Sequence, residues 1–247
     1  MDRFIKMVLL LALGLFLYSR IMSGTILFYI NERFVTLSLL ASIGFILIGF
    51  SYYRRGDQPA SLYNLGRQPI TWLGLLVAAI PVVIGVMVEP QPLGATAVGN
   101  RELDVGGLST NESRLRSITV PQGDGERMGL LPGERNVVDW LMEFQRVSDP
   151  SVLAGEEARV IGFVYYDDRF DEDAFMVGRF VLSCCVADAS PVGLIVRWPD
   201  TQDLAKDSWV EVNGQFTVGQ FDGRTIPVLA AETVEITEAP AQPYLYR

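Results

Sequence analysis

The chain contains no histidine and only two cysteines among its 247 residues. Without imidazole, the sequence excludes Ser-His-Asp triads, His-ligated zinc centres and histidine general bases. Two cysteines are too few for a disulfide scaffold or a four-thiolate metal site. Neighbouring carboxylates such as Asp139 with Glu143, or Glu156 with Glu157, are typical of surface charge. We therefore predict that the protein is not an enzyme, and the sequence identifies no cofactor.

Charge is distributed unevenly along the chain, which has 20 Lys and Arg residues against 29 Asp and Glu residues, a net charge of −9. Residues 1–88 carry 7 basic against 3 acidic residues, a net charge of +4. Residues 89–247 carry 13 against 26, a net charge of −13. An acidic surface repels the phosphate backbone, so the sequence excludes a nucleic-acid partner.

Long uncharged segments predict a membrane domain over residues 1–88, because a helix needs about 20 apolar residues to cross a bilayer. The segments at 34–53 and 69–88 each have 20 residues without a charge. Pro81 would kink the second of these, which membrane helices tolerate. A pair of buried core helices is the alternative, although globular helices of this length usually have a polar face.

The first apolar segment allows two interpretations. It follows Arg3 and Lys6 and ends near Ser19, so it is either an uncleaved span at about 3–19 or a secretory signal peptide. The residues after Tyr18 match a cleavage site poorly, which favours the span. The stretch at 21–33 is too short to cross twice, and we expect it to lie at the interface with Tyr29 at headgroup depth.

Basic residues beside the spans predict the orientation of the chain in the cell membrane. Five lie on one side and two on the other: Arg3, Lys6, Arg54, Arg55 and Arg67 against Arg20 and Arg33. The N-terminus is therefore expected in the cytoplasm. Three crossings then make this a multi-pass protein of the lipid bilayer with an extracytoplasmic C-terminal part.

Residues 89–134 are rich in Gly, Pro, Ser and charge, without sustained periodicity, and predict a flexible extracytoplasmic tether. Next, apolar residues at helical spacing predict a helix at 136–147 with Asn136 as its N-cap. This helix either packs on the outer domain or binds a partner.

Alternating apolar residues then predict five β-strands, separated by turn-forming clusters. The strands are expected at 158–166, 174–185, 192–198, 209–218 and 225–236. Five short strands of this kind favour an OB-like barrel in an extracytoplasmic domain at 135–247, with a bend at Gly162; an open sandwich is the alternative. The predicted fold class is thus three N-terminal transmembrane α-helices followed by an all-β, OB-like five-stranded barrel with one packing helix.

Barrels of this type often bind oligonucleotides or sugars, and four aromatic residues could form a stacking platform: Tyr165, Tyr166, Phe170 and Phe175. The acidic charge argues against nucleic acid as the ligand. A carboxylate run could bind a hard cation, but its spacing does not match an EF-hand, so a solvated loop is expected. The run consists of Asp167, Asp168, Asp171, Glu172 and Asp173.

The adjacent Cys184 and Cys185 end the second predicted strand, where their side chains would point to opposite faces unless a bulge turns them together. They could simply fill space, since free cysteine is often buried. They could also form a vicinal disulfide, present a thiol to a partner, or bind a metal together with Asp188. Two sulfurs and one carboxylate fall one ligand short of tetrahedral zinc, so a partner would have to complete such a site.

Three stretches of the chain resemble the YcgQ-like family of multi-pass membrane proteins described as permease subunits. They are SGTILFYINERF at 23–34, FVLSCCVADASPVGL at 180–194 and SWVEVNG at 208–214. The residues that carry this family motif are Gly24, Tyr29, Asn31, Arg33, Cys184, Cys185, Ala187 and Asp188. The resemblance covers both ends of the chain but not the tether.

The resemblance implies an accessory membrane-anchored subunit whose partner is a separate polytopic permease. The outer domain would then serve as a protein-interaction or substrate-presenting module. A link with metal homeostasis is also implied, but the missing histidine weakens it. The alternative function is a stand-alone extracytoplasmic thiol- or metal-handling protein that uses Cys184 and Cys185.

Overall fold

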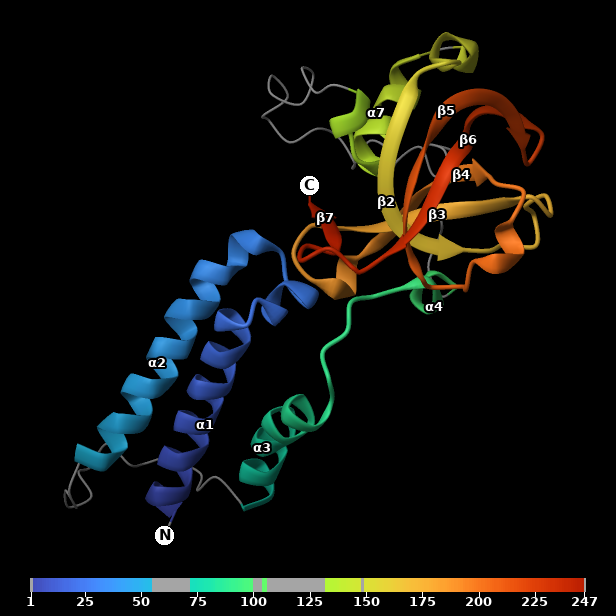
Figure 1. The fold of residues 1–247 in the computed structure, drawn as a ribbon. Helices are drawn as coiled ribbons and strands as arrows, with labels where there is room; N and C mark the ends of the chain where they lie inside the picture. Colours follow the sequence, from blue (N-terminus) through green and yellow to red (C-terminus); the bar gives the residue numbers. More distant parts are fainter. Residues whose placement is uncertain (1, 55–71, 100–103, 106–131, 148, 247) are drawn as a thin grey trace. The chain divides into compact units, whose positions relative to one another are not determined.

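The computed structural model describes residues 2–54, 72–99, 104–105, 132–147 and 149–246. The chain divides into two compact units, Met1–Gln91 and Pro92–Arg247, each of which is considered by itself. The first unit consists of helices and the second of a β-barrel with short helices around it (Figure 1).

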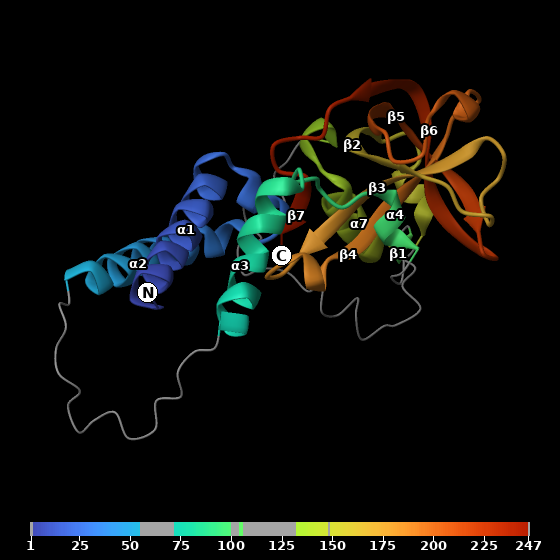
Figure 2. The ribbon, with the colours of Figure 1, turned by 90° about the horizontal axis from the view of Figure 1, so that it is seen from below.

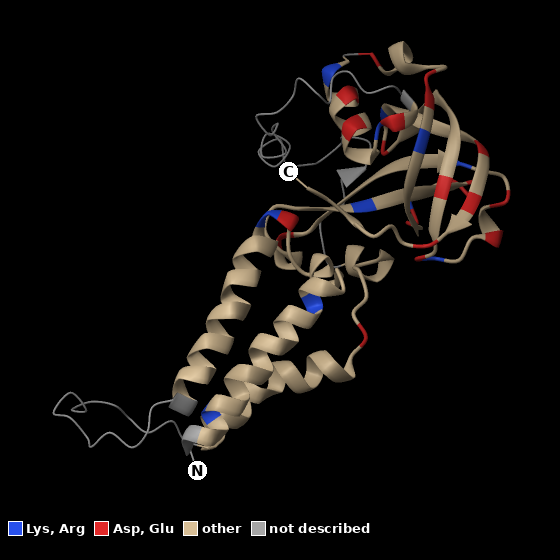
Figure 3. Cartoon of the chain, turned by 60° about the vertical axis from the view of Figure 1, so that its left-hand side comes forward, with Lys and Arg blue, Asp and Glu red and all other residues tan. Residues whose placement is uncertain are grey.

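Two helices of the first unit, α1 (Asp2–Met22) and α2 (Val35–Arg54), are long and apolar enough to cross a membrane. Only 6% and 11% of their most apolar windows are buried, whereas a core helix of a soluble protein would be mostly buried. Figure 3 shows that the helices of this unit carry few charged residues. The predicted N-terminal apolar helices are thus confirmed for two of the three segments, by length and composition.

The third helix, α3 (Trp72–Met87), contains Pro81 and has 16 described residues. At 1.5 Å per residue this is about 24 Å, less than the roughly 30 Å of a hydrocarbon core. A third span at 69–88 therefore remains a prediction. The predicted cytoplasmic loop with Arg55 and Arg67 lies outside the described residues.

Small residues allow α1 and α2 to pack closely, side by side in both views (Figures 1 and 2). The Ser42 hydroxyl donates a 2.8 Å hydrogen bond to the carbonyl oxygen of Gly14. A Cβ atom at Gly14 would lie 2.7 Å from Cγ1 of Ile46, so the helices could not keep this separation. Close contact at glycine and an interhelical bond from serine are the usual means by which membrane helices associate.

The second unit contains a closed barrel of five strands. The strands are β2 (Glu157–Tyr165), β3 (Ala174–Leu182), β4 (Ser190–Arg197), β5 (Trp209–Phe221) and β6 (Arg224–Thr237). They follow the order β2-β3-β4-β6-β5 and back to β2. All neighbours are antiparallel except β4 and β6, which pair in parallel at Val196↔Leu229 and Arg197↔Ala230. The predicted closed barrel is confirmed, and the open sandwich is wrong.

Two glycines allow the strands to turn. Gly162 lies where β2 exchanges its partner β5 for β3, and a Cβ atom there would be 2.4 Å from the carbonyl oxygen of Gly178. Asp222 and Gly223 join β5 to β6 with positive φ angles of 50° and 73°. Both residues of a two-residue type I′ turn require positive φ, which explains an Asp-Gly pair at this position.

Helix α7 (Val137–Arg146) packs into the largest core cluster of the barrel. Asn136 caps it as predicted, accepting from the backbone N–H groups of Val138 and Asp139. The Trp140 side chain is fully buried, and its ring lies 4.7 Å from that of Phe216. Because its apolar face is buried in the barrel, the helix is a packing helix, as the predicted fold class has it.

Three short segments lie beside the barrel strands: α4 (Ala95–Val98), β1 (Asp104–Val105) and β7 (Tyr244–Tyr246). Residues of α4 and β7 belong to a second core cluster on the barrel. β1 pairs in parallel with β4, and β7 in parallel with β3. Figure 2 shows α4 and β1 beside β3 and β4.

The residues before β1 belong to the range that the sequence assigned to the tether. In the structure, Ala95 and Val98 are buried against aromatic residues of the barrel. The backbone N–H of Leu93 donates to the Tyr244 hydroxyl over 2.8 Å, and that of Ala95 to Asp207 over 2.5 Å. A few apolar residues hold this stretch on the barrel, and their spacing has neither helical nor strand periodicity. Residues 106–131 of the predicted tether lie outside the described residues.

We predict that Gly14→Val weakens the packing of α1 on α2, because the new side chain must displace Ile46. Overpacking of this kind costs about 1–3 kcal/mol. Gly44→Val is the matched control, since a Cβ atom at Gly44 meets nothing within 4 Å. Thermal unfolding of the full chain in detergent measures both, and equal loss in the two variants would contradict the packing described here.

We also predict that a fragment of residues 92–247 is more stable than one of residues 130–247. The shorter fragment loses the buried Ala95 and Val98 and the two hydrogen bonds of this segment. The expected difference is on the order of 2–3 kcal/mol. Urea unfolding of both fragments measures it, and identical midpoints would show that residues 92–105 do not stabilise the barrel.

Candidate functional site

The two cysteines lie in a turn between β3 and β4 and not on a strand. β3 ends at Leu182, earlier than the predicted Cys185, and a short 3-10 helix follows at Val186–Asp188. The Asp188 carboxylate closes this turn: one oxygen accepts from the N–H of Ser183 at 3.0 Å and the other from that of Cys184 at 2.7 Å. An aspartate that bonds nearby backbone groups in this way competes with the strand ladder and ends it.

The turn brings the two thiols to the same region, so the expectation that they point to opposite faces of a strand is wrong. Both cysteines are free, with their Sγ atoms 3.6 Å apart. Cys184 is exposed and Cys185 is half-buried. Ala187, the remaining family-motif residue of this turn, is exposed.

The carboxylate beside the thiols makes Cys184 a poor nucleophile. A hydrogen bond to Asp188, followed by one with Cys185, raises the pKa of the Cys184 thiol to about 12. Partial burial raises the pKa of Asp188, but hydrogen bonds from Cys184 and from backbone N–H groups outweigh it and hold that pKa below its ordinary value. Reactive cysteines have lowered pKa values and lie in electropositive surroundings, which is the opposite arrangement.

The turn does not fit a resident metal ion by itself. Tetrahedral zinc needs four ligands, and both Asp188 oxygens already accept backbone hydrogen bonds. Within the described ranges, no group of three or more Cys, Asp or Glu side chains is arranged to hold a metal ion. A metal site of Cys184, Cys185 and Asp188 would therefore need further ligands beyond those that the described residues bring to this turn.

The four aromatic residues considered as a stacking platform do not form one. Phe175 is fully buried in the core. Tyr166 uses its hydroxyl to donate to the carbonyl oxygens of Thr201 and Leu204. Phe170 packs on Phe221, with 5.5 Å between the ring centroids. Tyr165 is partly buried against the core. Sequence alone does not distinguish an exposed platform from core packing.

The acidic residues considered earlier have structural contacts. In the carboxylate run, Asp167 pairs with Arg169 at 2.7 Å and Asp171 with Arg197 at 3.0 Å. Asp139 is not surface charge: it is 8% exposed and accepts from the N–H of Asn136 in the capping box of α7. These contacts fit loops and helix caps.

The family motif in the first unit forms the connection between α1 and α2. Gly24 follows α1 with a positive φ of 73°, a conformation that favours glycine. Asn31 caps the short helix Glu32–Phe34 by accepting from the N–H of Arg33 at 3.0 Å. Tyr29 is exposed. These residues therefore shape a tight connection between two apolar helices.

Sequence reasoning missed Arg179, a buried cation in β3. It donates to the carbonyl oxygens of Ile161 at 3.1 Å and Gln242 at 2.9 Å, and lies over the Trp209 ring. Burial lowers its pKa to about 10. The bond to Gln242 holds the segment that precedes β7. A single charge within the apolar run AFMVGRFVL was the available signal.

We predict that Asp188→Asn makes Cys184 more reactive. Loss of the carboxylate removes the bond that stabilises the protonated thiol, so the pKa of Cys184 falls towards its ordinary value. The thiolate fraction at pH 8, and with it the rate of alkylation by iodoacetamide, should rise at least about tenfold. The comparison is made in a Cys185→Ala background, and an unchanged rate would contradict the assigned role of Asp188.

Comparison with known proteins agrees with this architecture. Residues 134–247 match the model of the DUF1980 C-terminal domain, which covers the barrel and α7. A Streptococcus mutans protein named "Putative two-component membrane permease complex subunit" is 24% identical over 281 residues, covering 100% of this chain and 99% of the relative. The Bacillus subtilis protein named "UPF0703 protein YcgQ" is 26% identical over 100 residues, covering 40% of this chain and 35% of that protein.

The full-length match spans both units, and the family model covers the domain that carries the cysteine turn. The expected resemblance to the YcgQ-like family is thereby confirmed, and residues 134–247 are similar to the DUF1980 C-terminal domain.

Proposed function

We propose that the chain is an accessory, membrane-anchored subunit of a two-component permease complex. The observation that carries this proposal is the match over the whole chain to a relative named as a subunit of such a complex. The barrel would act as a protein-interaction or substrate-presenting module, and the partner would be a polytopic membrane protein.

The helical unit supports a subunit role better than a transport role of its own. A cavity of about 550 Å³ lies between α1 and α3 and is lined only by apolar residues: Phe4, Ile5, Val8, Leu9, Ala12, Trp72, Leu75, Leu76, Ala79, Val82 and Val83. Charged or polar groups inside a membrane usually mark transport pathways. Because no charged or polar residue is among the described residues that line this cavity, the partner would supply the route for a polar solute.

The topology is part of the proposal. We infer three membrane helices with a cytoplasmic N-terminus and an extracytoplasmic domain from residue 89 onward, on the basis of the five-to-two distribution of basic residues. The barrel is OB-like in this proposal, since the OB-fold is a five-stranded Greek-key barrel. The stand-alone thiol- or metal-handling function has less support, because Asp188 disfavours the thiolate of Cys184.

Co-purification tests the subunit role. The tagged full chain, extracted from its native membrane in mild detergent, is expected to retain a polytopic protein in near-equal amount, identified by mass spectrometry. An exposed cysteine placed at Thr225, in a Cys184→Ala/Cys185→Ala background, should react with an impermeant maleimide in intact cells. A chain that purifies alone in several detergents would contradict the subunit role, and labelling only after lysis would contradict the topology.

A further inference from the structure

The C-terminal half of β6 is an exposed strand edge. Within the described part of the chain, β4 pairs with β6 only as far as Ala230, whereas β5 continues to pair with β6 up to Thr237. The edge of residues 231–237 that faces away from β5 therefore has no described strand beside it. Glu232, Thr233, Glu235, Ile236 and Thr237 are all exposed there.

A β-bulge separates this edge from the part of β6 that closes the barrel. Asn213 pairs with Thr233 and Gly214 with Ala231, so Glu232 is the extra residue. Beyond it, five consecutive residues, Thr233–Thr237, continue the ladder with β5. Unpaired backbone groups of such an edge can accept another strand, which is the basis of β-strand addition.

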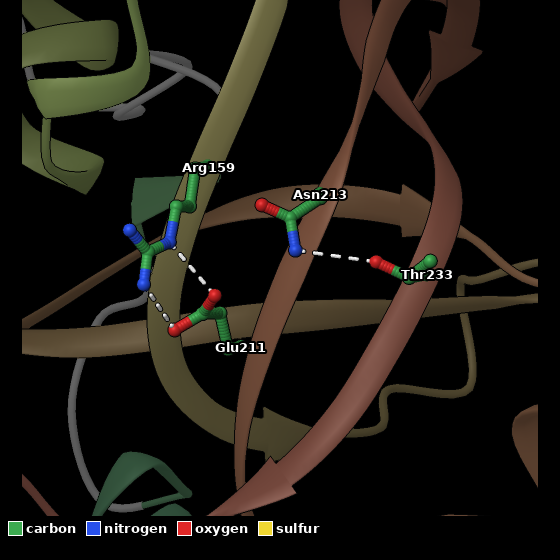
Figure 4. Close-up of polar contacts among 4 residues, drawn as sticks. All are labelled: Arg159, Glu211, Asn213 and Thr233. Carbon is green, nitrogen blue, oxygen red and sulfur yellow. Dashed lines mark hydrogen bonds and ion pairs between the residues drawn. The ribbon is translucent and has the colours of Figure 1, made fainter.

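The charges beside the edge indicate which strand would fit. Glu211 and Glu235 lie directly opposite each other on β5 and β6, an arrangement that destabilises a sheet. The single guanidinium of Arg159 on β2 binds both oxygens of Glu211, at 2.7 and 2.9 Å, as Figure 4 shows. The Glu235 side chain makes no hydrogen bond or ion pair among the described residues, and Arg159 acts on it only through a weaker electrostatic attraction.

Further carboxylates at Glu232 and Glu238 make this edge acidic, and Figure 3 shows many Asp and Glu residues on the barrel surface. A cation beside Glu235 would relieve its repulsion with Glu211. A second copy of the chain would instead bring like charges together. The exposed Ile236, 69% accessible, offers an apolar contact at the same edge.

We propose that residues 231–237 of β6 bind an extended, lysine- or arginine-bearing segment of a protein partner by β-strand addition. The added strand takes up the free backbone groups of the edge, and its basic side chains pair with Glu235 and Glu232. The identity of the partner as the permease subunit rests on the proposed function. The binding of a basic strand at this edge is independent of that proposed function.

A soluble peptide of five Lys-Thr repeats tests the edge in the full-length chain, held in non-ionic detergent. Threonine favours strands and lysine supplies the charge. Hydrogen exchange of the 231–237 amides should slow on addition of the peptide, and binding should weaken with salt. A peptide of five Glu-Thr repeats is the control, and equal protection by both peptides would overturn the proposal.

Variants separate the charge from the backbone contribution. Glu235→Lys should weaken binding of the Lys-Thr peptide about tenfold or more, whereas Glu157→Lys, on β2 and away from the edge, should have little effect. Successive N–H groups of a strand point to opposite edges. Of the N–H groups of Val234 and Glu235, one therefore points towards β5 and the other towards the free edge. Proline removes the N–H group, so the substitution on the β5 side should lower the thermal stability of the chain and the other should not. The variant that keeps its stability, Val234→Pro or Glu235→Pro, should abolish protection by the peptide.

The peptide experiment and the co-purification experiment together separate the proposed strand addition at β6 from the proposed subunit role. Peptide protection without a co-purifying membrane protein would support the edge and contradict the subunit role. Co-purification of a partner that Glu235→Lys and the stable proline variant leave unchanged would overturn the edge and keep the subunit role. Concentration-dependent dimers that protect the same amides would make a second copy the occupant and overturn the proposal.

Discussion

The parallel pairing of β4 with β6 is the contact on which the outer domain depends. Two residue pairs, Val196↔Leu229 and Arg197↔Ala230, turn a five-stranded sheet into a closed barrel. Closure creates the interior that Trp140 of α7 fills, and burial of large apolar side chains is the main stabilising contribution in such a small domain. Because this contact is short, β6 runs on beyond β4, and no strand among the described residues lies along that edge.

Local patterns predicted much of this fold, and long-range contacts account for the rest. Period-two alternation located all five barrel strands, and the spacing of apolar residues together with Asn136 located α7. The end of β3 was misplaced because the cysteine pair resembles a continuing strand, whereas the Asp188 side chain ends it from further along the chain. The packing of Ala95 and Val98 was missed, because two small apolar residues form no recognisable sequence pattern. Their burial depends on the aromatic side chains of the barrel that they cover.

The candidate sites show the same limit. A sequence can show that Cys184, Cys185 and Asp188 are close, but not that the carboxylate is already bonded to the backbone and suppresses the thiolate. Arg179 is buried because Ile161 and Gln242, from two other parts of the chain, supply carbonyl acceptors. In both places, hydrogen bonds between side chains and backbone groups determine what the side chains can do.

Photo-crosslinking from the β6 edge in native membranes tests this account most directly. A photoreactive amino acid replaces the exposed Ile236, and in a matched variant it replaces Val152, which is 66% accessible and lies in the 3-10 helix before β2. The account predicts a crosslink from position 236 to a polytopic membrane protein, and a weaker one or none from position 152. Equal crosslinking at both positions, or none at position 236, would contradict it.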